Sequence, residues 1–203
     1  MDKQEASGIA ILKIKSEHRS LAAVLHGMQY LMRQVVEHGE APNFPVLRAM
    51  TYYIDAFPER LHHPKEDRYL FRLLRQRTAE ETAILNVLEH QHAQGEGRIR
   101  ELEQALVRFE AGGARHAKEF AELVNEYAQF HWRHMRFEED IVLPLAERVL
   151  NAEDWNEIAE AFSNNADPLL GAQAEKEFND LFSRIAALAP PPIGLGTSAT
   201  NLT

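Results

Sequence analysis

The chain has 203 residues, a length that fits one domain with appendages and is sufficient to bury a hydrophobic core. Its 22 basic and 31 acidic residues give a formal net charge of -9, which disfavours binding to nucleic acid or to an anionic membrane surface. Cysteine is absent, so disulfides, iron–sulfur clusters and thiolate metal sites are excluded. A secretory signal and a long apolar window are also missing, so we expect a cytoplasmic protein.

Apolar residues recur at spacings of three and four along most of the chain, which is the helical period. The first run extends from Ile9 to about His38, the sequence GEAPNFP at 39–45 interrupts the pattern, and a second run extends from Leu47 to Leu74. Pro58 and Pro64 lie inside the second run. Because proline lacks a backbone donor and clashes with the preceding turn, we expect a kink or local unwinding between them.

Two further long helices follow. The third begins near Thr78, because Thr78 and Glu81 have the Thr-x-x-Glu spacing of a capping box, and it ends at the glycines of 111–113. The fourth extends from about Phe120 to about Leu150. Four long helices with short connections predict an all-α fold, an up-down-up-down four-helix bundle.

The C-terminal part of the chain is expected to add shorter helices. Asn151 and Asp154 have the spacing that caps the segment EDWNEIAEAF, and a second amphipathic stretch, AEKEFNDLFSRIAALA, comes later. We therefore divide the chain into a bundle over 1–150 and an extension over 151–203 that packs on the bundle and ends in a proline- and glycine-rich tail. The extension is also where we expect any second copy or protein partner to bind.

Imidazoles and carboxylates occur at core positions of all four long helices. The second and fourth helices carry a His-x-x-x-Glu pair, whose spacing of four places both side chains on one face. The first and third helices each carry a histidine where the apolar stripe would place a leucine. The residues are His18, His62, Glu66, His92, His134 and Glu138.

Each part of this set has a plain structural interpretation when it is taken alone. A single histidine in an apolar stripe is usually a core residue, and an isolated His-x-x-x-Glu is usually an exposed ion pair. The duplicated pair on alternate helices favours metal binding instead. Nitrogen and oxygen ligands suit iron, manganese or zinc better than calcium or magnesium. Because carboxylates can bridge two ions, we expect a dinuclear centre with iron as the first choice.

Residues close to the set have several interpretations. His63 lies about 100° around the helix from His62, so it could orient a ligand, bind metal itself or be solvated. His131 lies one turn before His134 and could orient a ligand or line an entrance, with coordination the less favoured role. Tyr127 could be a core residue or could donate a hydrogen bond to bound oxygen.

Acids and glycines near the set are equally ambiguous. Asp67, Glu139 and Asp140 are surface acids or partners that hold imidazole tautomers. Gly95 and Gly97 weaken the third helix, which indicates a close helix approach beside His92 or a plain kink.

The stretches SEHRSL, FPERLHHPKEDRYLF, LEHQHAQGE and HMRFEEDIVLPLAE, in this order, make residues 9–150 resemble the hemerythrin-like family, the HHE cation-binding domain. The resemblance extends to bacterial members with a C-terminal extension. It implies a bundle around a non-haem di-iron centre with an oxo or hydroxo bridge. By motif it implies six metal ligands, with Glu66 and Glu138 bridging: His18, His62, Glu66, His92, His134 and Glu138.

One difference from the oxygen-carrying members stands out. Those proteins have a second histidine four residues before the position of His92, where this chain has Leu88. Six protein ligands then replace seven, and the extra coordination position would be open or filled by water, His63 or Glu96.

The resulting expectation is a metal-binding protein whose centre meets oxygen, nitric oxide or peroxide in sensing, redox chemistry or iron handling. An oxidase or peroxidase that turns over at the open position is one alternative. A protein in which the metal only staples the bundle is another.

Overall fold

The computed structural model describes residues 1–163 and Ile185, and over these residues the chain is helical apart from its first two residues and the connections at 39–43, 78–81 and 150–151. This confirms the all-α prediction. In chain order the elements are α1 (Lys3–His38), α2 (Phe44–Ile54), η1 (Asp55–His62), α3 (His63–Lys65), η2 (Glu66–Phe71), α4 (Arg72–Arg77), α5 (Thr82–Gly112), η3 (Gly113–His116), α6 (Ala117–Phe137), η4 (Glu138–Val142), α7 (Leu143–Val149) and α8 (Ala152–Ser163).

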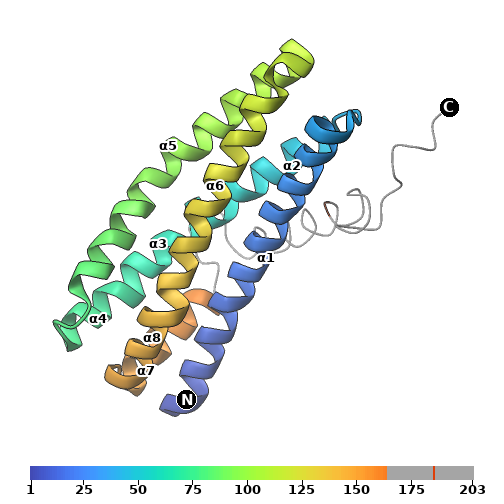
Figure 1. The fold of residues 1–203 in the computed structure, drawn as a ribbon. Coiled ribbons are helices and arrows are strands. Elements are labelled where there is room, and N and C mark those ends of the chain that lie inside the picture. Colours follow the sequence, from blue (N-terminus) through green and yellow to red (C-terminus); the bar gives the residue numbers. More distant parts are fainter. Residues whose placement is uncertain (164–184, 186–203) are drawn as a thin grey trace.

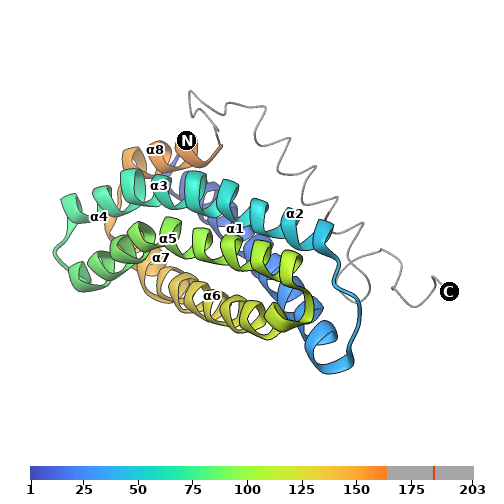
Figure 2. The same cartoon turned by 90° about the horizontal axis from the view of Figure 1, so that it is seen from above.

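These elements form four long antiparallel rods. The first is α1, the second runs continuously from α2 to α4, the third is α5, and the fourth runs from α6 to α7 (Figure 1). α1 packs against α2 and α6, and α5 packs against the same two neighbours, which closes the bundle (Figure 2). The predicted up-down-up-down topology and the hemerythrin-like bundle are confirmed.

The first rod begins at Lys3 rather than at Ile9. Asp2 caps it, since its side chain accepts a hydrogen bond from the backbone nitrogen of Glu5 at 2.9 Å. The rod ends at Gly39, which has a φ of 71°, the left-handed conformation that favours glycine. The extra N-terminal turns carry the small buried residues Ala6, Ser7 and Ala10, and α1 packs along α8.

The predicted capping box at Thr78 is wrong, because α5 begins at Thr82. The backbone nitrogen of Thr78 still donates to Leu74 at the end of α4, so this residue closes the preceding helix. Its hydroxyl accepts from the backbone nitrogen of Glu80 at 3.0 Å, which forms a turn. Glu81 then enters α5 with a φ of 54°. Thr78 and Glu81 therefore lie in the turn between α4 and α5 and do not form a capping box.

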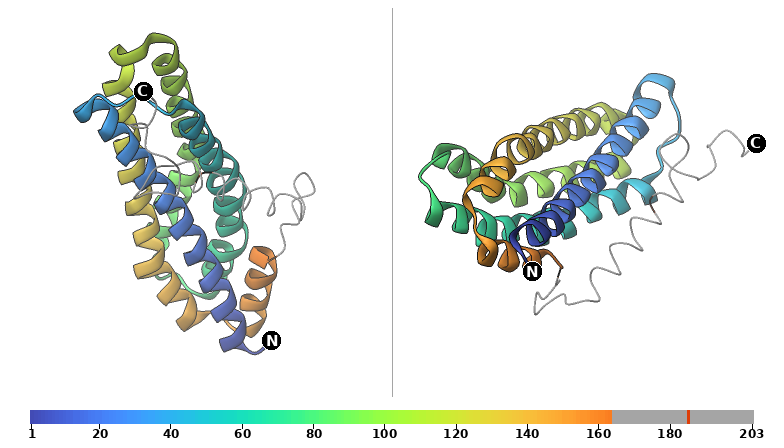
Figure 3. Two further views of the ribbon diagram at one scale, coloured as in Figure 1. Left: turned by 90° about the vertical axis from the view of Figure 1, so that its right-hand side faces the viewer. Right: turned by 90° about the horizontal axis from the view of Figure 1, so that it is seen from below.

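The predicted cap of α8 is confirmed. The backbone nitrogen of Asp154 donates to Asn151 Oδ1 and that of Asn151 donates to Asp154 Oδ2, both at 3.0 Å. Arg77 of α4 also donates two hydrogen bonds to Asp154, at 2.8 and 2.9 Å. α8 is thereby tied to α4 while it lies along α1 (Figure 3). The second amphipathic stretch and the tail lie outside the described residues, so the packing of the whole extension stays a prediction.

The interior consists of two apolar clusters, one at each end of the bundle. The first surrounds Leu25, Met50 and Phe120, towards the end where α1 meets α2. The second surrounds Ile14, Phe71 and Trp155, and α8 supplies part of it. Polar residues separate the two clusters. The helices therefore bring a polar layer to the middle of an otherwise apolar interior.

Three π-helical segments flank this polar layer among the described residues, namely η1, η2 and η4. Pro58 lies inside η1 and Pro64 follows it, so the expected unwinding is present as widened turns and the rod stays helical. The backbone nitrogen of His63 donates five residues back to Pro58. Because a π-helix has more residues per turn than an α-helix, neighbouring side chains diverge less around the axis.

The cap of α8 gives a test of the packing of this helix on the bundle. Replacing Asn151 with Ala removes the acceptor for the Asp154 backbone nitrogen, and we expect the free energy of unfolding to fall by about 1 kcal/mol. Urea denaturation followed by circular dichroism measures it. Glu160→Gln, at an exposed position of the same helix, is the control and should change stability by less than about 0.5 kcal/mol. Equal stability of the two variants would contradict the assigned cap.

Candidate metal centre

The six residues singled out by their spacing meet in the layer between the two apolar clusters. Each of their side chains is at most 5% exposed. α1, the second rod, α5 and the fourth rod supply them, as expected from the sequence. They are His18, His62, Glu66, His92, His134 and Glu138.

The first half of the layer pairs α1 with the second rod. The Nε2 atoms of His18 and His62 are 3.1 Å apart. Glu66 Oε1 lies 3.3 Å from His62 Nε2, and Glu138 Oε2 lies 3.3 Å from His18 Nε2. Two imidazoles and one oxygen from each carboxylate therefore converge.

The second half repeats this arrangement between α5 and the fourth rod. The Nε2 atoms of His92 and His134 are also 3.1 Å apart. Glu138 Oε1 lies 3.1 Å from His134 Nε2, and Glu66 Oε2 lies 3.6 Å from His92 Nε2. Each carboxylate thus directs one oxygen to each pair of histidines.

These side chains fit a cation better than they fit one another. All four oxygens of Glu66 and Glu138 are buried, and none accepts a hydrogen bond. Buried polar atoms without partners are costly, and those in native structures call for a ligand. Ligand atoms about 2.1 Å from a metal ion and about 90° apart are about 3 Å from each other, close to the shortest distances here. The residues present therefore fit a metal.

The other ring nitrogen of each of these histidines is held by an oxygen. Because carboxylate and amide oxygens only accept, each Nδ1 is the donor, and Nε2 is the nitrogen that faces inward. The four pairs are His18 with Glu139 at 2.9 Å, His62 with Glu17 at 2.6 Å, His92 with Asp67 at 2.7 Å and His134 with Gln91 at 2.9 Å. The ring orientations that metal binding requires are therefore set before any ion arrives.

Three acids could be surface residues or partners of the imidazoles. Asp67 and Glu139 accept hydrogen bonds from histidine Nδ1 atoms. The Asp140 side chain is 64% exposed and pairs with Arg136, so it is a surface residue. Sequence reasoning missed Glu17 and Gln91. A signal was present, since each of them directly precedes the histidine that its own helix contributes to the layer. Each one reaches across to the histidine of a neighbouring rod, and only the packing of the rods reveals that partner.

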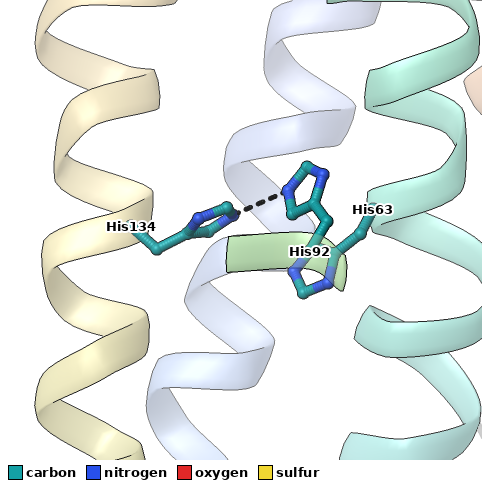
Figure 4. A group of neighbouring side chains, drawn as sticks. All are labelled: His63, His92 and His134. Atoms are coloured by element: carbon teal, nitrogen blue, oxygen red, sulfur yellow. Dashed lines mark hydrogen bonds between the residues drawn. The ribbon is translucent and has the colours of Figure 1, made fainter. Parts of the chain in front are cut away.

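His63 is buried, at 4% exposure, so its interpretation as a solvated residue is wrong. Its ring is stacked on that of His92, with the centroids 4.4 Å apart. One ligand atom from each of His63, His92 and His134 lies within 4.8 Å of the others, and the three come from three different rods (Figure 4). His63 begins the short α3 between the π-helical segments η1 and η2, and its ring centroid lies 5.8 Å from that of His62.

Two other candidates do not enter the group. The Glu96 side chain is 68% exposed and pairs with Arg100, so its interpretation as a ligand is wrong. It follows His92 by one turn, but His92 already lies at the edge of the interior and the next position faces solvent. His131 is fully buried, and its Nε2 lies 3.3 Å from Glu59 instead of facing the carboxylates of the layer.

The charges of the layer interact strongly. Burial alone would lower the pKa of His18, but Glu138 and Glu139 outweigh it and raise this pKa to about 9. In the same way Asp67 and Glu138 raise the pKa of His92 to about 10. Burial would raise the pKa of Glu138, yet His134 and its neighbours hold it well below the usual range. Without a metal, protons on His18 and His92 would thus balance the charge of the buried carboxylates near neutral pH.

The walls of the layer come from several elements. Phe162 of α8 is 1% exposed and makes an edge contact with His62, with the ring centroids 5.7 Å apart. On the opposite side, an open pocket of about 330 Å³ borders His18 and is also lined by Arg19, Met135 and Glu139. The layer is therefore covered by α8 beside His62 and bordered by an open surface pocket beside His18.

Comparison with known proteins agrees with this geometry. Residues 10–146 match the family described as the hemerythrin HHE cation-binding domain, and the chain belongs to this family. Membership implies cation binding, and the histidine and glutamate groups of the layer are able to hold a metal. Searches of curated proteins and of solved structures found no match. Within the part of the chain that the structure describes, no helix is long and apolar enough to cross a bilayer.

The raised pKa values of His18 and His92 predict the pH dependence of metal binding. Near pH 7 both groups carry a proton without metal, and an ion must displace it, so affinity should rise with pH up to about 10. We expect proton release on binding of Zn²⁺, measured by calorimetry in buffers of different ionisation enthalpy. Glu96→Gln should show the same slope as the unmodified protein. An affinity independent of pH would contradict the prediction.

Proposed function

We propose that the protein is a non-haem di-iron protein whose centre meets a small ligand such as oxygen, nitric oxide or peroxide. One observation carries this proposal: each oxygen of Glu66 and Glu138 is buried without a hydrogen bond and faces one of two histidine pairs. Two carboxylates that span two imidazole pairs are suited to bridging two ions. Such a centre suits a role in sensing or handling iron, or the small ligand of iron, better than a purely structural role.

The donor atoms divide into two sets. His18 and His62 with Glu66 Oε1 and Glu138 Oε2 would hold one ion. His92 and His134 with Glu66 Oε2 and Glu138 Oε1 would hold the other, and His63 lies beside this second set. Together with His63 the protein would offer five imidazoles and two carboxylates, so His63 would take the place left by Leu88.

The mixture of imidazole and carboxylate favours iron, with zinc and manganese as alternatives. Iron, when bound, supplies one-electron redox chemistry and positions for an oxygen-derived ligand. The chain contributes the surroundings. The oxygens on Nδ1 orient the imidazoles, and the two apolar clusters exclude water from both ends of the layer. The open pocket beside His18 is the route by which a small molecule would arrive.

Metal content and the optical spectrum of aerobically purified protein test the proposal. We expect about two irons per chain with the near-ultraviolet absorption of an oxo-bridged pair. His62→Ala and Glu138→Ala should lose both, because each removes donors from the layer. His90→Ala is the control, since His90 is exposed and bonds Gln94 on the surface of α5.

The outcomes separate the possibilities. Zinc in place of iron would contradict the redox part of the proposal and retain the dinuclear site. No metal in the unmodified protein would contradict the proposal as a whole. If metal serves only as a staple, its removal should lower the melting temperature without any response of the spectrum to oxygen or nitric oxide.

A second candidate is an oxidase or peroxidase, and the pocket against His18 favours it. The first donor set has two imidazoles whereas the second has access to three, so the side facing the pocket has the fewer protein ligands. A substrate molecule would meet that side. Saturable peroxide consumption faster than that of an equal amount of free iron would support the enzyme. Consumption at the rate of free iron would leave only the binding function.

A further inference from the structure

A second group of buried polar side chains lies against the metal layer and is not part of the six-residue set. The group consists of Glu59, His63, Tyr127 and His131, and we call it the Glu59 cluster. Its side chains are all at most 5% exposed. Burial of four polar side chains beside a metal site requires a reason beyond packing.

The carboxylate of Glu59 is the centre of this cluster. It accepts hydrogen bonds from the Tyr127 hydroxyl at 2.7 Å, on Oε1, and from His63 Nδ1 at 3.3 Å, on Oε2. His131 Nε2 also lies 3.3 Å from Oε1. Tyr127 thus holds one carboxylate oxygen, with His131 close to it, while the other oxygen accepts from His63.

The charge state of Glu59 agrees with this acceptor role. Burial would raise its pKa, but the neighbouring imidazoles of His131 and His63 hold it well below the usual range. Burial, together with the Glu59 carboxylate, also raises the pKa of Tyr127 well above its usual value, so its hydroxyl stays a donor. An ionised carboxylate with no proton of its own obliges His63 to donate from Nδ1.

Gly95 of α5 leaves the room that this carboxylate occupies. A Cβ at Gly95 would lie 1.8 Å from Glu59 Oε2, the oxygen that accepts from His63. A Cβ at Gly97, two residues further on the same helix, would meet no atom within 4 Å. The first glycine is therefore explained by the carboxylate of another rod and not by a kink. Its position matters because the affected oxygen is the one bound to His63.

We propose that Glu59 is a positioning residue that aims Nε2 of His63 at the ion held by His92 and His134. This inference rests on the proposed dinuclear site. His63 then matches the four other histidines of the layer, each of which gives Nδ1 to an oxygen and turns Nε2 inward. Glu59 thereby supplies the third imidazole of the second ion, in a chain that has Leu88 at the usual position.

The experiment compares Gly95→Ala with Gly97→Ala in the full chain, with zinc as a diamagnetic probe. Nitrogen-15 spectra of histidine-labelled protein distinguish Nε2 bound to metal from Nε2 free, and a zinc titration gives the two affinities. We expect five coordinated imidazoles in the unmodified protein and in Gly97→Ala. Gly95→Ala should show four, with the second zinc bound roughly 10–100-fold more weakly and the first unchanged.

Glu59→Leu is the second variant, and it decides the matter if Gly95→Ala does not fold. Leucine is close to glutamate in size and offers no acceptor to His63, whereas glutamine would keep one, as Gln91 does for His134. We expect the same selective loss of His63 from the metal. A purely structural role would weaken both zinc sites or neither.

The results separate the two proposals. Unmodified protein that binds two zinc ions through four imidazoles, or variants that keep five, would overturn the role of Glu59 and leave the dinuclear site standing. Unmodified protein that binds no zinc would overturn the dinuclear site together with the role of Glu59.

Discussion

The structure depends on one electrostatic constraint, which is that Glu66 and Glu138 are buried without hydrogen bonds in the middle of the bundle. Two carboxylates without compensation between apolar clusters would cost several kcal/mol each. The imidazoles around them, protonated or bound to an ion, are what make their burial tolerable. The oxygens on the outer ring nitrogens extend this compensation towards the surface. Two of these oxygens belong to Glu139 and Asp67, whose side chains are 34% and 37% exposed, so the compensation reaches solvent there.

The sequence predicted the bundle and the members of its polar layer because both follow from one periodicity. A histidine at a leucine position and a His-x-x-x-Glu pair each fix a helix face, so the six residues could be placed without knowledge of the packing. The sequence could not predict what depends on contacts between rods. Glu17 and Gln91 bond histidines of neighbouring rods, and Gly95 makes room for Glu59, which lies 36 positions earlier in the chain.

Two alternatives near the layer are wrong for different physical reasons. Glu96 is one of several candidates for the extra coordination position, but His92 already lies at the margin of the interior, so one more turn leads outward. A solvated His63 is one of three interpretations of that residue, and its burial and its stacking on His92 exclude it. The Thr78 spacing fits both a turn and a cap, and the hydrogen bond of its own backbone to Leu74 decides between them.

The contact between Phe162 and His62 changes what counts as the functional unit of this chain. The family match ends at residue 146, yet a wall of the metal layer comes from α8, beyond that limit. A protein cut at the family boundary would retain every donor atom and still expose His62 to water. The segment defined by sequence similarity is thus shorter than the segment that shields the metal layer from water, and only the longer segment includes α8.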